Sequence, residues 1–105
     1  MVRFLDVFET TQSQQRLGII RFIVFQSEYT AEIDTVLVIP CRDFAANLNL
    51  GKLTPRLQIN GKLALAMVPQ MAGIDRRALG SVVIASAADI RDELISALDR
   101  LVTGF

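Results

Sequence analysis

The sequence contains no histidine, which removes the commonest general base and the commonest nitrogen ligand of metal ions. Its one cysteine, Cys41, has no partner for an internal disulfide and no second thiolate for a zinc site. Arg42 beside it could lower the pKa of the thiol, but a small buried cysteine is the more common case. No glycine-rich phosphate-binding motif occurs. We therefore expect no catalytic residue, no metal and no cofactor, and a protein that acts by binding is favoured over an enzyme.

Neither sign of charge is in excess, because eleven lysines and arginines balance eleven aspartates and glutamates. Nucleic-acid binding requires a basic surplus on some face, and none is visible in the sequence. The longest apolar run, residues 18–25, is interrupted by Arg21 and is far shorter than the roughly 20 residues of a membrane-spanning helix. The first residues carry no apolar run and no signal-peptide cleavage site. We expect a cytoplasmic protein that does not contact the membrane.

A chain of 105 residues has the size of one domain, so residues 1–105 are predicted to fold as a unit. Short β patterns, separated by polar stretches or by glycine and proline, predict about six strands. These strands are expected at residues 2–8, 18–26, 35–39, 57–59, 62–67 and 81–85, with a loop at 9–16, a loop containing one helical turn at 41–52 and a compact connection at 68–80. Strands and helices do not alternate, which predicts an α+β fold with a mostly antiparallel, bent sheet or small barrel.

Three local signals refine this prediction. Asn60-Gly61 supplies the two positive-φ positions of a type I′ turn, which predicts a hairpin at this point. Pro40 cannot donate to a strand ladder, so the third strand is expected to end there. Residues 18–26 are apolar on both faces of the predicted strand. One face is expected to pack on the protein's own helix, and the other is expected to need a second copy of the molecule.

The last twenty residues predict an amphipathic helix around which the chain is organised. Apolar side chains recur at steps of three and four residues, at Ile90, Leu94, Ile95, Leu98, Leu101 and Val102. Ser86 and Asp89 have the spacing of a capping box, and Gly104 suits the left-handed position just beyond a helix. Phe105 follows that glycine. It is either held at the surface as part of a binding tip or folded back onto the sheet as core, and the sequence leaves both open.

Five motifs occur in order along the chain. They are residues 22–28 (FIVFQSE), 38–40 (VIP), 53–61 (LTPRLQING), 79–80 (LG) and 97–105 (ALDRLVTGF). No single motif is specific, but the set and its spacing resemble the CcdB toxin family over almost the whole chain.

The resemblance implies a small SH3-like antiparallel β-barrel with a C-terminal α-helix, forming a homodimer. Family members poison DNA gyrase: the paired helix tips enter the dimer of gyrase A subunits and trap the cleaved DNA complex. A CcdA-like antitoxin neutralises the toxin by wrapping it with a disordered C-terminal segment. Toxin and antitoxin together repress their own operon, so the resemblance implies contact with operator DNA only through the antitoxin.

In the family, the gyrase contact is a tryptophan, a glycine and an isoleucine at the chain end, and the corresponding residues here are Thr103, Gly104 and Phe105. Gly104 matches and Phe105 keeps a bulky apolar end, but Thr103 departs. Threonine cannot stack on a gyrase arginine as a flat ring can, and losing such an anchor costs about 2–4 kcal/mol of binding free energy. The resemblance assigns antitoxin binding to Tyr29, Asp99, Val102 and Thr103.

This departure keeps two alternatives open. One is a non-toxic relative that binds an antitoxin-type partner without acting on gyrase. The other is an endoribonuclease, because a related toxin family with the same barrel cleaves messenger RNA. The second alternative is weaker, since the chain is not basic and has no histidine to move protons. An arginine and a hydroxyl could still perform such a cleavage.

Overall fold

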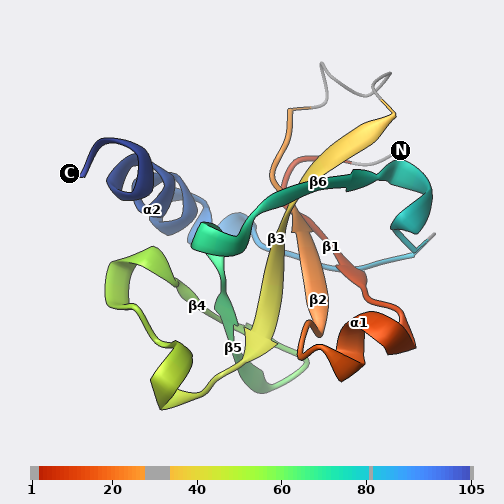
Figure 1. Cartoon of the computed structure of the whole chain (residues 1–105), viewed down its shortest axis with the longest axis horizontal. Coiled ribbons are helices and arrows are strands. Elements are labelled where there is room, and N and C mark those ends of the chain that lie inside the picture. The colour runs from red at the N-terminus through yellow and green to blue at the C-terminus, as the bar shows by residue number, and fades with distance from the viewer. Residues whose placement is uncertain (1–2, 28–33, 81, 105) are drawn as a thin grey trace.

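A curled antiparallel sheet and a C-terminal helix account for most of residues 3–27, 34–80 and 82–104, which are the residues that the computed structural model describes (Figure 1). The strands are β1 (Asp6–Glu9), β2 (Arg21–Val24), β3 (Thr35–Asp43), β4 (Arg56–Ile59), β5 (Lys62–Ala66), β6 (Ala72–Asp75) and β7 (Val83–Ser86). The helices are α1 (Gln12–Arg16) and α2 (Arg91–Thr103), joined to the strands by loops and short 3₁₀ turns. The predicted α+β class, with an antiparallel sheet and a C-terminal helix, is confirmed.

Strand β3 lies at the centre of the sheet, whose order is β4-β5-β3-β2-β1-β7 with β6 also paired to β3. One edge of β3 pairs with β2. Its other edge pairs with β6 over residues 35–38 and with β5 over residues 41–43. Strands β6 and β5 therefore pair with opposite ends of β3, and the sheet curls between them (Figure 1).

This change of partner explains why the prediction that the third strand ends at Pro40 is wrong. Pro40 lies between the segment that pairs with β6 and the segment that pairs with β5, so its missing N–H removes no bond from either ladder. Its carbonyl still accepts a hydrogen bond from the backbone N–H of Met67 at 2.9 Å. Proline is tolerated inside this strand because the ladder on that edge is interrupted there.

The predicted hairpin is confirmed. Strands β4 and β5 are antiparallel, with Ile59 opposite Lys62. Asn60 has φ +53° and Gly61 has φ +80°, which are the two positive-φ positions that a type I′ turn requires. The turn chemistry was therefore sufficient to predict both the loop and the register of this pair.

Both faces of β2 are covered by the chain itself, so the expectation that one face needs a second copy is wrong. Ile23 belongs to the core that lies against α2. Phe22 and Val24 belong to a second apolar cluster on the opposite face. Ile74 of β6 and Leu79 pack against that cluster. The stretch expected to be only a compact connection, residues 68–80, thus contains a strand that closes the second face.

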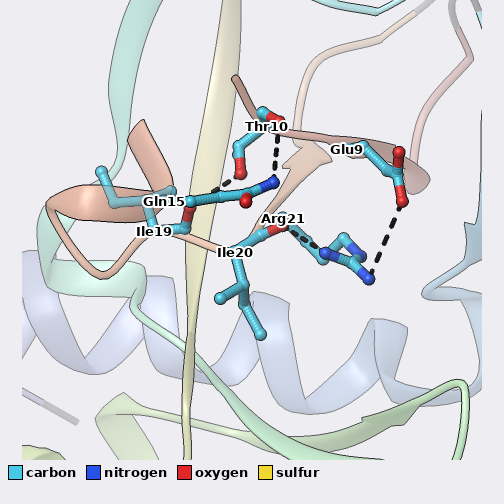
Figure 2. A network of polar contacts seen from close by, with 6 residues as sticks. All are labelled: Glu9, Thr10, Gln15, Ile19, Ile20 and Arg21. Atoms are coloured by element: carbon cyan, nitrogen blue, oxygen red, sulfur yellow. Dashed lines mark hydrogen bonds and ion pairs between the residues drawn. The ribbon is translucent and has the colours of Figure 1, made fainter. Parts of the chain in front are cut away.

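A helix occupies part of the predicted loop at residues 9–16. Its first turn has a capping box: the Thr11 hydroxyl accepts from the Gln14 N–H at 3.3 Å, and the Gln14 side chain accepts from the Thr11 N–H at 2.8 Å. The Thr10 hydroxyl donates to the Ile19 carbonyl at 2.7 Å, and the Gln15 amide donates to the Thr10 carbonyl at 3.1 Å (Figure 2). These bonds fix α1 to the ends of β1 and β2.

The boundaries of the first and last strands also differ from their predictions. Strand β1 begins at Asp6, after Leu5 adopts the left-handed φ of +70° that interrupts an extended segment. Strand β7 runs from Val83 to Ser86 rather than from residue 81. Residues 2 and 81, where these strands were expected to begin, lie outside the described part of the chain.

Candidate functional site

The apolar stripe of α2 is longer than the sheet that it covers. Leu94 and Ala97 are fully buried, and Ile95 and Leu98 pack against the same core. One turn further on, Leu101 is 43% exposed and Val102 is 73% exposed. The end of α2 therefore projects beyond the sheet, as Figure 1 shows, and carries apolar side chains into solvent.

The exposed end of α2 is closed by Gly104. This residue has φ +82°, the left-handed conformation expected from the sequence, and its N–H donates to the Arg100 carbonyl at 2.9 Å. The Thr103 hydroxyl donates to the Asp99 carbonyl at 2.7 Å, one turn back along the helix. These two bonds hold the last turn in a helical conformation up to the point at which the chain leaves it.

The predicted capping box at the other end of α2 is wrong. Ser86 is the last residue of β7 and lies opposite Asp6 in the strand ladder. Its hydroxyl accepts from the Ala88 N–H at 3.2 Å, which opens a 3₁₀ turn over residues 88–90. Helix α2 begins only at Arg91, with no side-chain cap from Ile90. Ser86 therefore belongs to strand β7 and not to the N-terminal cap of α2, where the S-x-x-D spacing had placed it.

The structure gathers three of the four candidate antitoxin-binding residues on one turn. Asp99, Val102 and Thr103 are all exposed in the last turn of α2, and Gly104 follows them directly. Tyr29 and Phe105 lie outside the described residues. Leu101 belongs to the predicted apolar stripe of the helix, and its exposure adds it to this surface. Residues 99–104 are called the α2 tip below.

The helical spacing of Leu101 matches that of the buried Leu94 and the partly buried Leu98, so the apolar pattern alone does not indicate that Leu101 is exposed. The point along α2 at which the apolar side chains become exposed is set by how far the sheet extends beneath the helix. The signal in the sequence is the length of the stripe, which spans residues 90–102, whereas the predicted strands that it must cover are short.

Cys41 is buried and has no role at the α2 tip. Burial raises the pKa of its thiol from 9.0 to about 12, and the positive charge of Arg21, opposite it in the ladder, only partly opposes this effect. Arg42 does not lower this pKa, because its guanidinium donates to Gln70 Oε1 at 3.1 Å and to the Leu17 carbonyl. The more common case, a small buried cysteine, is confirmed. Cys41 is a core residue with an un-ionised thiol at neutral pH.

We expect the Cys41 thiol to react with Ellman's reagent only when the protein unfolds. Stability should also fall as the pH rises from about 9 to about 12, because the unfolded chain loses the thiol proton in this window while the folded chain retains it. The measurement is the free energy of unfolding at several pH values, compared with that of Cys41→Ala, which lacks the titrating group. Rapid reaction of the native protein with the reagent would contradict this prediction.

The described residues contain neither a metal-binding cluster nor a membrane-spanning helix. Within residues 3–27, 34–80 and 82–104, no group of three or more cysteine, aspartate or glutamate side chains is arranged to hold a metal ion. No helix in the same ranges has the length and apolarity to cross a membrane. The α2 tip itself presents apolar side chains, one hydroxyl, one carboxylate and the guanidinium of Arg100, which is a surface suited to contact with another protein.

Comparison with known protein families agrees with this arrangement. A family model described as CcdB protein matches residues 3–104. The match covers nearly the whole of the 105-residue chain and includes the α2 tip up to Gly104. No curated protein matches the sequence at a significant level.

Proposed function

The chain belongs to the CcdB family of toxins from toxin–antitoxin modules, and from this premise we propose that it inhibits DNA gyrase through the α2 tip. The observation that carries the proposal is the exposure of the tip. Val102 and Leu101 remain in solvent although they continue the same stripe that is buried at Leu94. Adjacent exposed apolar side chains that continue a buried stripe form a contiguous apolar surface of the kind that partner proteins bind.

In this proposal Thr103, Gly104 and Phe105 contact the gyrase A subunit. The left-handed φ of Gly104 supports this role, since it ends α2 directly after the exposed Leu101, Val102 and Thr103. The protein acts as a homodimer, which presents two tips to the symmetric dimer of gyrase A subunits. It functions in the cytoplasm, where gyrase and DNA are found.

The proposed antitoxin contacts are Tyr29, Asp99, Val102 and Thr103. Thr103 belongs to both sets, so an antitoxin bound there would exclude gyrase from the tip. A CcdA-like antitoxin that covers Val102 also removes its exposed apolar surface from water, which supports tight binding. Toxin and antitoxin together would bind operator DNA through the antitoxin and repress their own transcription.

Deleting Gly104 and Phe105 is expected to abolish gyrase inhibition without unfolding the domain. Among the described residues, the deletion removes the hydrogen bond from the Gly104 N–H to the Arg100 carbonyl and leaves the buried Leu94 and Ala97 in place. Growth of expressing cells, DNA cleavage by purified gyrase, RNA integrity and thermal unfolding should be measured for the full chain and the deletion variant. We expect growth arrest and trapped DNA cleavage for the full chain only, with similar unfolding temperatures.

Leu17→Ser provides the matched control, because Leu17 is also an exposed apolar side chain but follows α1, on the other side of the molecule from the α2 tip (Figure 1). The Leu17→Ser variant should be as toxic as the parent, while the Val102→Ser variant should be less toxic. A deletion variant as toxic as the parent would eliminate the tip from the mechanism. Growth arrest with cut RNA would instead indicate an endoribonuclease. The absence of growth arrest would indicate a non-toxic relative that only binds an antitoxin-type partner.

A further inference from the structure

A groove runs along the polar side of α2, next to the α2 tip. Its volume is about 410 Å³. One wall is formed by Lys52, Pro55 and Arg56, which precede or begin β4. The other wall is the helix, with acidic side chains at its first turn and Arg100 at its last turn. The groove thus joins the β4–β5 hairpin to the end of α2 that carries the tip.

The cations of this groove are not neutralised by the described part of the chain. Within that part, no carboxylate oxygen lies within ion-pair distance of Lys52, Arg56 or Arg100; the ion pairs there join Arg21 to Glu9, Arg77 to Asp75 and Arg91 to Asp92. Of the two acidic residues that line the groove, Asp92 is therefore already paired with Arg91, at 3.2 Å. The groove lining therefore has three cations against two carboxylates, one of which is paired with a cation outside the lining, so an incoming negative charge is favoured.

One of these cations is already held in place. The Arg56 guanidinium lies over the Phe44 ring, 5.0 Å from its centroid. This contact restricts the side chain before any ligand arrives, so less conformational entropy is lost when the guanidinium binds a carboxylate. Arginine is also the residue best suited to bidentate recognition of a carboxylate.

We propose that this groove binds an acidic segment of the antitoxin, whose carboxylates pair with the guanidinium groups of Arg56 and Arg100. This inference rests on the proposed function and adds the chemistry by which the partner is recognised. Arg100 directly precedes Leu101 and Val102 in the chain. A segment held by Arg100 therefore reaches the α2 tip, and the same partner covers its apolar side chains. Nucleic acid is a poorer occupant, since binding a phosphate backbone requires a basic surplus along an extended surface, and the chain has no net charge.

The test uses isothermal titration calorimetry with the protein encoded by the reading frame next to that of this chain, which is the candidate antitoxin. Arg56→Glu and Arg100→Glu should each weaken antitoxin binding by about tenfold or more, because each replaces an attraction by a repulsion. Binding by the unmodified protein should also weaken as salt is added. Arg16→Glu is the matched control: it makes the same charge change on the exposed face of α1, away from the groove, and should leave the affinity unchanged.

A reciprocal variant makes the test specific. Replacing an acidic residue of the antitoxin by lysine should restore binding to Arg56→Glu and weaken binding to the parent. If the parent binds the antitoxin but both groove variants bind it equally well, the groove has no role and the proposed function stands. If the parent does not bind the antitoxin at all, both the groove and the proposed partner are wrong. A loss confined to operator DNA binding would overturn the groove as a protein site in favour of nucleic acid.

Discussion

Leu94→Ala is expected to lower the free energy of unfolding by about 3 kcal/mol, because it deletes buried methyl groups and leaves a cavity that the neighbouring side chains only partly fill. Leu94 has no solvent exposure and lies in the core cluster that also contains Ile23, Ile39 and Ala97. Small domains have total stabilities of only about 5–15 kcal/mol. This single change should therefore remove a large share of the stability, as measured by urea or guanidinium denaturation.

The control for this prediction lies on the same helix. Val102→Ala deletes methyl groups from a side chain that is 73% exposed, so its effect on stability should stay within about 0.5 kcal/mol. Leu101→Ala should fall between the two variants, since Leu101 is 43% exposed. Equal losses of stability for Leu94→Ala and Val102→Ala would mean that the end of α2 is packed on the protein, and that the proposed tip is not a free surface.

The parts of the fold that were predicted correctly depend on local chemistry. Asn60-Gly61 specifies a hairpin turn through its own backbone conformations, whatever surrounds it. Gly104 ends a helix for the same kind of reason. In both cases the determining interaction spans only a few residues, so the sequence pattern is sufficient.

The errors occurred where distant segments decide the outcome. Pro40 was expected to end a strand, but β5 and β6, which approach from later in the chain, leave a gap in the ladder at that position. Strand β6 was missed because its sequence, AGID, has little β propensity of its own and becomes a strand by pairing with β3. Ser86 was assigned to a helix cap, yet strand pairing with β1 placed it in β7.

The candidate site divides in the same way. Asp99, Val102, Thr103 and Gly104 are close in sequence, so their common position at the end of one helix could be predicted. The groove could not be predicted from the sequence, because Arg56 and Arg100 come to line the same cavity only when α2 packs beside the start of β4. Charges this far apart in the chain carry no joint signal in a single sequence.

Thr103→Trp is expected to strengthen gyrase inhibition by about thirtyfold to a thousandfold, which corresponds to about 2–4 kcal/mol of added binding free energy. Position 103 is exposed in the last turn of α2, so the larger ring displaces no core side chain. An indole ring buries about 150–250 Å² at an interface and can stack on an arginine of the partner, which threonine cannot do. The measurement is the toxin concentration that half-inhibits supercoiling by purified gyrase.

Thr103→Val separates the effect of the ring from the loss of the hydroxyl. This variant keeps the shape of threonine but removes the hydrogen bond from the Thr103 hydroxyl to the Asp99 carbonyl. That bond lies at the surface, so its loss should change inhibition by much less than the gain from tryptophan. If Thr103→Trp gave no gain while the deletion of Gly104 and Phe105 still abolished inhibition, the final two residues alone would make the gyrase contact. A gain in both variants would show that the hydroxyl opposes binding, and the anchoring role of an aromatic ring at position 103 would be wrong.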